Sequence, residues 1–155
     1  MDTPATEPFV VRKSVTIHAT PLEVWEALTR PDLTKRYFFG WRVDSDWTPG
    51  SPISFKRKIL WKKVEFKGEV LEVHPQRLLR YLLKNTKGPD DPANQSIITD
   101  ELHPCEEGTV LSVTDDVGSA EGAEKRLKKS EKAWDKVLHG LKTFLEEPRP
   151  HSRFY

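Results

Sequence analysis

The chain has 155 residues, a length typical of one domain and sufficient to bury a core without disulfides or metal ions. Its 25 lysines and arginines nearly balance 24 aspartates and glutamates, so the formal net charge is +1 and no overall field would attract nucleic acid or an anionic membrane. The single cysteine, Cys105, excludes an intramolecular disulfide and a multi-cysteine zinc site, and no apolar run approaches the roughly 18 residues of a transmembrane helix.

The chain begins with a segment that lacks the signals of regular structure. Residues 1–8 contain two prolines and two acidic residues but no hydrophobic signal core, so we expect a flexible leader, no secretory peptide and a cytoplasmic location. In residues 9–18, side chains of one kind recur at every second position, as in a strand. One face carries aliphatic residues and a single charged residue, Lys13.

A capping box predicts where the first helix begins. Thr20 can act as the N-cap, Pro21 occupies the first helical position, and Glu23 lies three residues after Thr20. Pro31 ends this helix, and residues 32–36 are predicted to form another short turn before an aromatic cluster. Two short helices are therefore expected after the first strand.

Alternating segments bounded by turn residues predict six further strands. They are residues 41–47, 53–60, 64–74, 77–84, 96–103 and 109–117. Gly68 is expected to mark a bend or bulge in the longest of these strands. Residues 85–95 are expected to form a long polar loop, because they contain glycine, prolines and aspartates.

From residue 120 onward, apolar side chains recur every three or four positions, which predicts one long amphipathic helix that Pro148 ends. We therefore expect an α+β fold, in which a curved antiparallel sheet of about seven strands wraps around this C-terminal helix. Residues 9–147 would form a single domain, followed by a flexible tail at residues 148–155. A sheet covered by one helix leaves a concave interior, where we expect a cavity.

This order of elements, together with several local phrases, resembles the helix-grip fold of the START-related (SRPBCC) superfamily. Within it, the chain is similar to the activator of heat-shock protein 90 ATPase homologue family. The matching phrases are residues 18–29 followed by Pro31, residues 68–73 before Pro75 and Leu79, residues 102–109, and the apolar spacing from Trp134 to Leu145. The resemblance covers about residues 10–147 and implies a ligand-enclosing domain with a link to the stress response.

Two aspartates lie where period-two geometry would place apolar side chains facing the interior. Asp100 shares a strand face with Ile98 and Leu102, and Asp115 shares one with its own apolar neighbours two and four residues away. Two carboxylates in a low-dielectric cavity would raise each other's pKa values and could transfer protons or bind a cationic group. The alternative, which the uncertain register favours, is that a bulge turns one or both to solvent.

Aromatic residues are frequent enough to line a pocket for a flat or apolar ligand, although some of them will only fill the core. The candidate cavity residues are Phe38, Trp41, Phe55, Phe66, Tyr81, Asp100, Asp115, Trp134 and Leu138. Core packing is the stronger interpretation for Phe66 and Tyr81, whereas packing and ligand contact are equally favoured for Phe38 and Trp41.

Two other groups of residues can be interpreted either as functional sites or as exposed segments without a specific role. The basic and aromatic hairpin at residues 56–63 could touch phosphates or a protein partner, although charged hairpin tips are usually only solvated. His103 and Cys105 could ligate a metal, but nothing near them completes a site, so an exposed turn is preferred. No catalytic signature or phosphate-binding loop is present, and we expect no cofactor, no metal and no nucleic-acid partner.

These observations leave three functional hypotheses. The first is a domain without defined catalysis that encloses a hydrophobic small molecule, such as a lipid-like or aromatic metabolite. The second is a polyketide-cyclase-like or hydrolase enzyme that uses Asp100 and Asp115 as base and acid. The third is a chaperone-associated protein-interaction module that uses its sheet edge or the hairpin at residues 56–63. An open interior would favour a binding domain, and a filled one would favour an interaction module.

Overall fold

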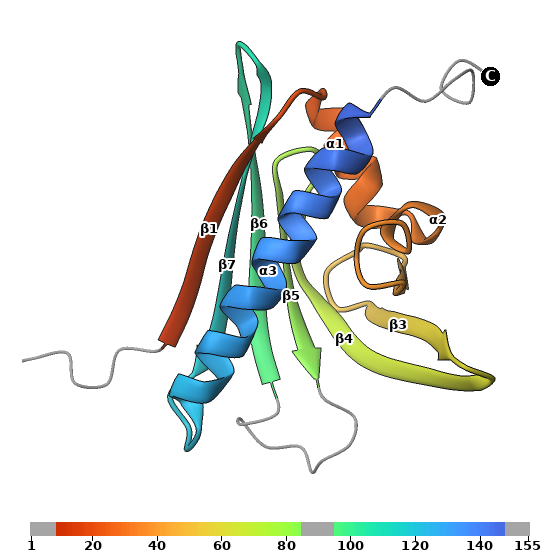
Figure 1. Cartoon of the computed structure of the whole chain (residues 1–155), viewed down its shortest axis with the longest axis vertical. Coiled ribbons are helices and arrows are strands. Elements are labelled where there is room, and N and C mark those ends of the chain that lie inside the picture. Colours follow the sequence, from red (N-terminus) through yellow and green to blue (C-terminus); the bar gives the residue numbers. More distant parts are fainter. Residues whose placement is uncertain (1–8, 85–94, 148–155) are drawn as a thin grey trace, which may run out of the picture.

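The fold is a curved antiparallel sheet crossed on its concave side by one long helix (Figure 1). A computed structural model describes residues 9–84 and 95–147. The described residues form seven strands, which are β1 (Phe9–Ile17), β2 (Arg42–Ser45), β3 (Pro52–Ile59), β4 (Lys62–His74), β5 (Leu78–Lys84), β6 (Gln95–Cys105) and β7 (Gly108–Gly118). The helices are α1 (Pro21–Thr29), α2 (Pro31–Thr34) and α3 (Ala123–Glu146). The predicted helix-grip class is confirmed. The predicted leader and tail lie outside the described residues, as does the predicted long loop except for its last residue, Gln95.

The strands β2 to β7 form a meander in which each pairs with the next, and β1 returns to pair with β7. The turn between β6 and β7 contains only Glu106 and Glu107, so that Cys105 pairs with Gly108. Gly108 has a φ of +140°, and a Cβ at this position would lie 2.4 Å from the carbonyl oxygen of Ile17. The end of β1 approaches this turn so closely that only glycine can occupy the position.

The capping box predicted for α1 is confirmed. The Thr20 hydroxyl accepts the Glu23 N–H over 3.1 Å, and the Glu23 carboxylate accepts the Thr20 N–H over 2.9 Å. The short α2 follows at once and ends at Thr34, which is fully buried. The Thr34 hydroxyl donates to the carbonyl of Trp41 and accepts the N–H of Val43, both over 2.9 Å. This single hydroxyl therefore fixes the beginning of β2 against α2.

The second strand is shorter than predicted, covering Arg42–Ser45 rather than residues 41–47. Trp47 has a left-handed backbone with a φ of +56°, and its N–H donates to the Ser45 hydroxyl over 3.0 Å. This local bond takes the place of strand pairing and ends β2. The Trp47 indole N–H then reaches the carbonyl of Thr29, at the end of α1, over 2.9 Å.

A bend or a bulge was expected at Gly68, and the bulge of this strand lies two to four residues further on. The irregular pairing between β4 and β5 falls between Val70 and Glu72, so Leu71 is the extra residue. Gly68 keeps its register, but a Cβ at this position would lie 2.6 Å from the carbonyl oxygen of Leu82. The glycine therefore allows the neighbouring strand to approach closely. Close approach of another backbone, like a bulge or a bend, is a common reason for glycine in a strand.

The long helix α3 begins at Ala123, three residues after the predicted start. Gly122 has a left-handed φ of +86°, a conformation that lies outside the helix. Arg126 bridges this region, because its guanidinium donates to the carbonyls of Val117 and Glu121 over 2.9 and 2.8 Å. The predicted apolar stripe is confirmed by the buried helix residues Ala123, Trp134, Val137, Leu138, Leu141, Phe144 and Leu145.

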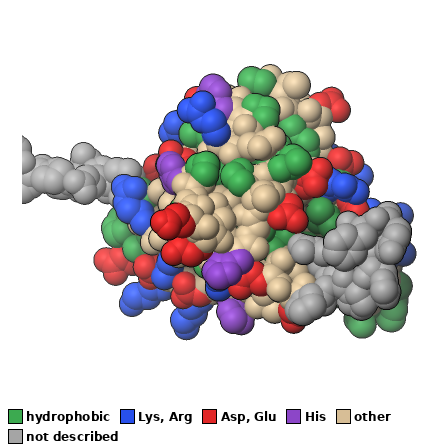
Figure 2. Space-filling view, turned by 90° about the horizontal axis from the view of Figure 1, so that it is seen from above, with side chains coloured by type: hydrophobic (Ala, Val, Ile, Leu, Met, Phe, Trp, Pro, Cys, Tyr) green, Lys and Arg blue, Asp and Glu red, His purple; other side chains and the backbone are tan. Residues whose placement is uncertain are grey.

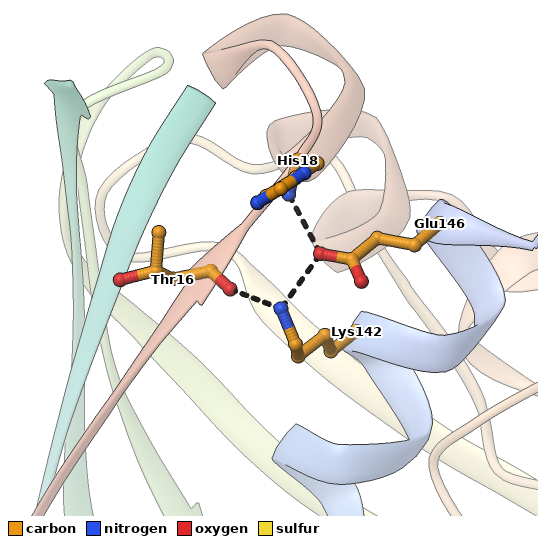
Figure 3. A network of polar contacts seen from close by, with 4 residues as sticks. All are labelled: Thr16, His18, Lys142 and Glu146. Carbon is orange, nitrogen blue, oxygen red and sulfur yellow. Dashed lines mark hydrogen bonds and ion pairs between the residues drawn. The ribbon is translucent and has the colours of Figure 1, made fainter. Parts of the chain in front are cut away.

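Polar contacts fix α3 to β1, its nearest strand. Figure 3 shows Lys142 and Glu146 on the last turns of the helix reaching toward the end of β1. The Lys142 ammonium donates to the Thr16 carbonyl over 2.6 Å and pairs with Glu146 over 2.7 Å, and the same carboxylate oxygen accepts the His18 N–H over 2.8 Å. Nearer the middle of α3, Asp135 forms an ion pair with Lys13, the lysine on the apolar face of β1, over 3.1 Å.

We expect the substitution Glu146→Gln to lower the free energy of unfolding by roughly 0.5–1 kcal/mol at neutral pH, because a charged acceptor is lost from a partly exposed network. The Lys142 and His18 hydrogen bonds hold the pKa of Glu146 below its usual value of 4.5. The carboxylate therefore contributes its stability above that value and loses it as the pH falls through the lower folded-state pKa. Urea unfolding at neutral and acidic pH checks this.

The substitution Glu147→Gln is the matched control, since Glu147 lies beside Glu146 but is exposed. Equal losses of stability in the two variants would contradict a specific role for the Glu146 network.

Candidate ligand-binding cavity

A small cavity lies between α3 and the concave face of the sheet. Its walls are mainly aliphatic and aromatic, and they come from α1, α2, the segment that follows α2, the strands β2, β3, β5, β6 and β7, and α3. Four of the lining side chains carry a hydroxyl or carboxyl group, namely Thr34, Tyr37, Tyr81 and Asp100. The free space amounts to about 20 Å³ for the centre of a water-sized sphere, which is enough for one water molecule or one small polar group.

Six of the predicted cavity residues line this space and three do not. The lining residues are Phe38, Phe55, Tyr81, Asp100, Trp134 and Leu138. Trp41, Phe66 and Asp115 lie outside the lining. The prediction missed Thr34 and Tyr37, which border the cavity from α2 and the residues after it. The aromatic cluster that begins at Tyr37 was the available signal for this wall.

Phe38 connects the sheet wall of the cavity to the helix wall. Its ring contacts Trp134 of α3 edge-on, with centroids 5.8 Å apart, and Phe55 of β3 with centroids 6.5 Å apart. Phe55 in turn contacts Tyr81 of β5, with centroids 6.2 Å apart. Edge-on and tilted contacts of this kind are favourable for aromatic pairs. One side of the cavity is therefore a continuous aromatic wall.

Trp41 and Phe66 belong to a separate cluster next to the cavity. Their ring centroids are 5.0 Å apart, and the Arg57 guanidinium lies 4.5 Å from the centroid of Trp41. Arg57 also donates to the carbonyl of Phe39 over 2.6 Å. Phe66 pairs directly with Phe55 across the strands, so both rings lie on the same face of the sheet. This cluster extends the concave apolar surface toward the β3–β4 hairpin.

Asp100 is the buried carboxylate that lines the cavity. It is 3 % exposed, and among the described residues none forms a hydrogen bond with its carboxylate. Burial, assisted by the negative charge of Asp115, raises the pKa of Asp100 to about 7. The pKa values of Tyr37 and Tyr81 are raised as well, first by burial and then by the charge of Asp100, which places both phenols near this carboxylate.

Asp115 is buried too, but its carboxylate is engaged with α3. One oxygen accepts the Ser130 hydroxyl over 2.6 Å and the Trp134 indole N–H over 3.0 Å. Burial raises the pKa of Asp115, and these hydrogen bonds from the helix oppose the rise. The carboxylate therefore connects β7 to the helix, and its position differs from that of Asp100 in both partners and access to the cavity.

The expectation that a bulge would turn one or both aspartates to solvent is wrong. Asp100 and Asp115 are 3 % and 6 % exposed. The pairing of β6 with β7 runs without a register shift from Ile97 opposite Asp116 to Cys105 opposite Gly108. Asp100 pairs with Val113, so Asp115 lies diagonally across from it on the same face.

Other chemistry has less support in the described parts of the chain. His103 is exposed and Cys105 is partly buried near the β6–β7 turn. Within residues 9–84 and 95–147, no three His, Cys, Asp or Glu side chains come together as a metal site would require. Within the same ranges, none of the helices combines the length and the apolar character that a bilayer crossing needs.

Comparison with solved structures finds the same architecture in bacterial proteins. The protein ChR145 of Cytophaga hutchinsonii is 37 % identical, with a TM-score of 0.73, and the match covers 88 % of this chain and 93 % of that one. The protein MLL2253 of Mesorhizobium loti is 24 % identical, with a TM-score of 0.74 and coverage of 88 % and 96 %. CalU16 of Micromonospora echinospora is 23 % identical, with a TM-score of 0.63 and coverage of 93 % and 78 %. The last two share the fold alone.

Comparison with proteins of curated function finds no match. The sequence model described as "Activator of Hsp90 ATPase homolog 1-like protein" matches residues 18–146. The fold of this family supports a ligand-binding domain, with the space between the sheet and the long helix as the place for a ligand. From this match, and from the 37 % identity to ChR145, the chain belongs to the family of activator of Hsp90 ATPase homolog 1-like proteins.

Proposed function

We propose that this protein binds a small, mainly apolar or aromatic molecule between α3 and the sheet, and that Asp100 receives a cationic or hydrogen-bond-donating group of that molecule. The observation that carries this proposal is Asp100 itself, a buried carboxylate on an apolar cavity without a donor among the described residues. A buried polar group without a partner costs about 1–3 kcal/mol. A ligand that supplies a donor would recover this free energy.

The interior is nearly filled, which taken alone favours an interaction module, and its free space is smaller than such a ligand. Binding therefore requires the cavity to open. The backbone of α3 approaches β1 and β7 most closely, whereas side chains such as Phe38 and Trp134 fill the space toward β3 and β5. Phe38 and Trp47 are only partly buried and lie on irregular backbone, so they can move at less cost than residues of the sheet. Burial of about 300 Å² of apolar ligand surface would supply roughly 7 kcal/mol before the costs of association.

A second candidate function is acid–base catalysis by Asp100 alone. Its pKa of about 7 allows it to accept and to release a proton near neutral pH. A base-and-acid pair formed with Asp115 has less support, because the Asp115 carboxylate is held by Ser130 and Trp134 and does not line the cavity. Contact with a chaperone, a role in the stress response and a cytoplasmic location stay predictions.

The substitution Asp100→Asn should remove one component of the pH dependence of stability. The pKa of Asp100 is about 7 in the folded protein and near 3.8 without burial, so the folded state binds more protons between these values. The contribution of this residue should therefore lower the free energy of unfolding of the wild type by roughly 4 kcal/mol as the pH rises from about 4 to about 7. Above about pH 7 this contribution should stay constant. In urea unfolding, the asparagine variant should lack this fall, so its free energy of unfolding should increase relative to that of the wild type as the pH rises.

The exposed Asp44 provides the control for this experiment, through the substitution Asp44→Asn. A stability profile of the Asp100→Asn variant that runs parallel to the wild type across this range would contradict the proton-binding role assigned to Asp100.

Ligand binding can be tested with pairs of compounds that differ only in charge. Phenethylamine and tryptamine should bind about tenfold or more tightly than propylbenzene and 3-propylindole above about pH 8, where Asp100 is ionised. The preference should disappear in the Asp100→Asn variant and persist in Asp44→Asn. NMR titration gives the affinities, and native mass spectrometry extends the search to apolar metabolites.

Two outcomes would count against the proposal. Absence of any bound compound in both measurements would remove the binding function. A preference for amines that survives Asp100→Asn would show that another group recognises the charge.

A further inference from the structure

The turn between β3 and β4 exposes three successive apolar residues. Leu60 and Trp61 are 83 % and 87 % exposed, and Ile59 is 46 % exposed. They lie at the tip of a hairpin that projects beyond the part of the sheet crossed by α3 (Figure 1). Single exposed apolar residues are common on protein surfaces, but three adjacent ones at a projecting tip mark an interaction site. We call residues 59–61 the apolar tip.

Lysines flank the apolar tip on both strands. Lys58 pairs directly with Lys63 across the hairpin, and Lys62 pairs with Ile59. Like charges directly opposite each other destabilise a strand pair. Lys58, Lys62 and Lys63 form no ion pair with any residue in the described parts of the chain. The hairpin therefore concentrates positive charge at a cost to folding, without compensation from the described residues.

This positive charge is local. Five cationic residues lie between Lys56 and Lys63, and since the whole chain has a net charge of +1, the remainder has a net charge of −4. At the opposite end of the sheet, where α1 and the β6–β7 turn lie, acidic and basic side chains are interspersed (Figure 2). Beside the hairpin, Lys35 and Arg42 add to a basic surface recess of about 490 Å³ that Lys56 and Lys63 also line. Such a charge distribution orients the hairpin toward an anionic surface.

We propose that the β3–β4 hairpin docks this protein onto the anionic surface of a lipid bilayer. Leu60 and Trp61 enter the interfacial region, and the flanking lysines contact lipid phosphates. An indole is favourable at the boundary between head groups and acyl chains, and lysine can keep its ammonium at the phosphates while its stem follows the apolar tip. Each lysine near such a surface strengthens binding by about fivefold.

A lipid surface fits the shape of this hairpin better than an acidic protein does. The apolar residues form a convex tip, and a protein would need a matching concave pocket to bury them. A bilayer interface accommodates a convex apolar tip without a preformed pocket, as it does for other interfacial segments. The proposal concerns the outer hairpin alone and is independent of what the cavity binds.

The test is co-sedimentation of the full-length protein with lipid vesicles. Binding should be strong with vesicles that contain about 30 % phosphatidylglycerol in phosphatidylcholine and weak with phosphatidylcholine alone. It should fall at least tenfold when the salt concentration rises from about 0.1 M to about 0.5 M. The substitutions Leu60→Ser and Trp61→Ser together should lower the affinity at least tenfold, since they remove the inserting group.

A matched pair of charge variants separates the hairpin from a general effect of charge. The triple substitution Lys58→Gln, Lys62→Gln and Lys63→Gln should weaken binding roughly 100-fold. The substitutions Lys125→Gln, Lys128→Gln and Lys129→Gln remove the same charge from the exposed face of α3 and should change binding less than about threefold. All of these positions are exposed, so circular dichroism should show the wild-type fold in every variant, with no melting temperature below that of the wild type. Loss of the repulsion between Lys58 and Lys63 should raise the melting temperature of the hairpin variant slightly.

Three results would overturn the proposal. The first is no sedimentation with anionic vesicles, and the second is an equal loss of binding in the two lysine variants. The third is equal affinity for soluble polyglutamate and for vesicles together with no effect of the serine substitutions, which would assign the hairpin to an acidic protein instead.

Discussion

Burial of one face of α3 against the concave sheet is the constraint on which the rest of the structure depends. The buried residues of this helix, from Ala123 to Leu145, would otherwise expose an apolar stripe along most of its 24 residues. Each large aliphatic or aromatic side chain buried in this way stabilises the fold by roughly 1.5–3 kcal/mol. The polar contacts at Lys13, Lys142 and Glu146 are partly exposed and contribute less. They fix where the helix lies on β1, and the helix position in turn decides which side chains enclose the cavity.

The two interior aspartates show how the same side chain acquires different properties from its partners. Asp115 faces Ser130 and Trp134, so one of its oxygens accepts two hydrogen bonds from the helix and helps to hold it, while the other oxygen is buried without a hydrogen-bond partner among the described residues. Asp100 lies diagonally across on the neighbouring strand, among mainly apolar side chains, and none of the described residues forms a hydrogen bond with its carboxylate. Burial without a donor shifts its pKa to about 7, which makes its charge dependent on pH in the physiological range. A cavity close to the size of one water molecule is thus lined by a titratable carboxylate.

The sheet extends further than one helix can cover, and this difference divides the molecule into two regions. Where α3 lies over the sheet, the interior is packed to within about 20 Å³ of free space. Beyond it, Arg57 covers the ring of Trp41, which contacts Phe66, and further out Leu60 and Trp61 are exposed to solvent. The strands β3 and β4 can project in this way because every residue of β3 pairs with β4. A nearly filled interior that borders one buried carboxylate and an outer hairpin with an exposed apolar tip are therefore consequences of the same architecture.

The features that the sequence determines by itself are those set by near neighbours. Thr20 and Glu23 form their capping box within one turn, and the alternation of β6 and β7 and the apolar stripe of α3 follow from the periods of strand and helix. The same alternation placed Asp100 and Asp115 on the inward face, but only the unbroken pairing of β6 with β7 decided that both are buried. Only the tertiary structure could show that Asp115 meets Ser130 while Asp100 meets no donor among the described residues, that Trp47 bonds to Thr29, and that Gly68 makes room for Leu82. These outcomes depend on atoms brought together from distant parts of the chain, and local periodicity contains no information about which atoms those are.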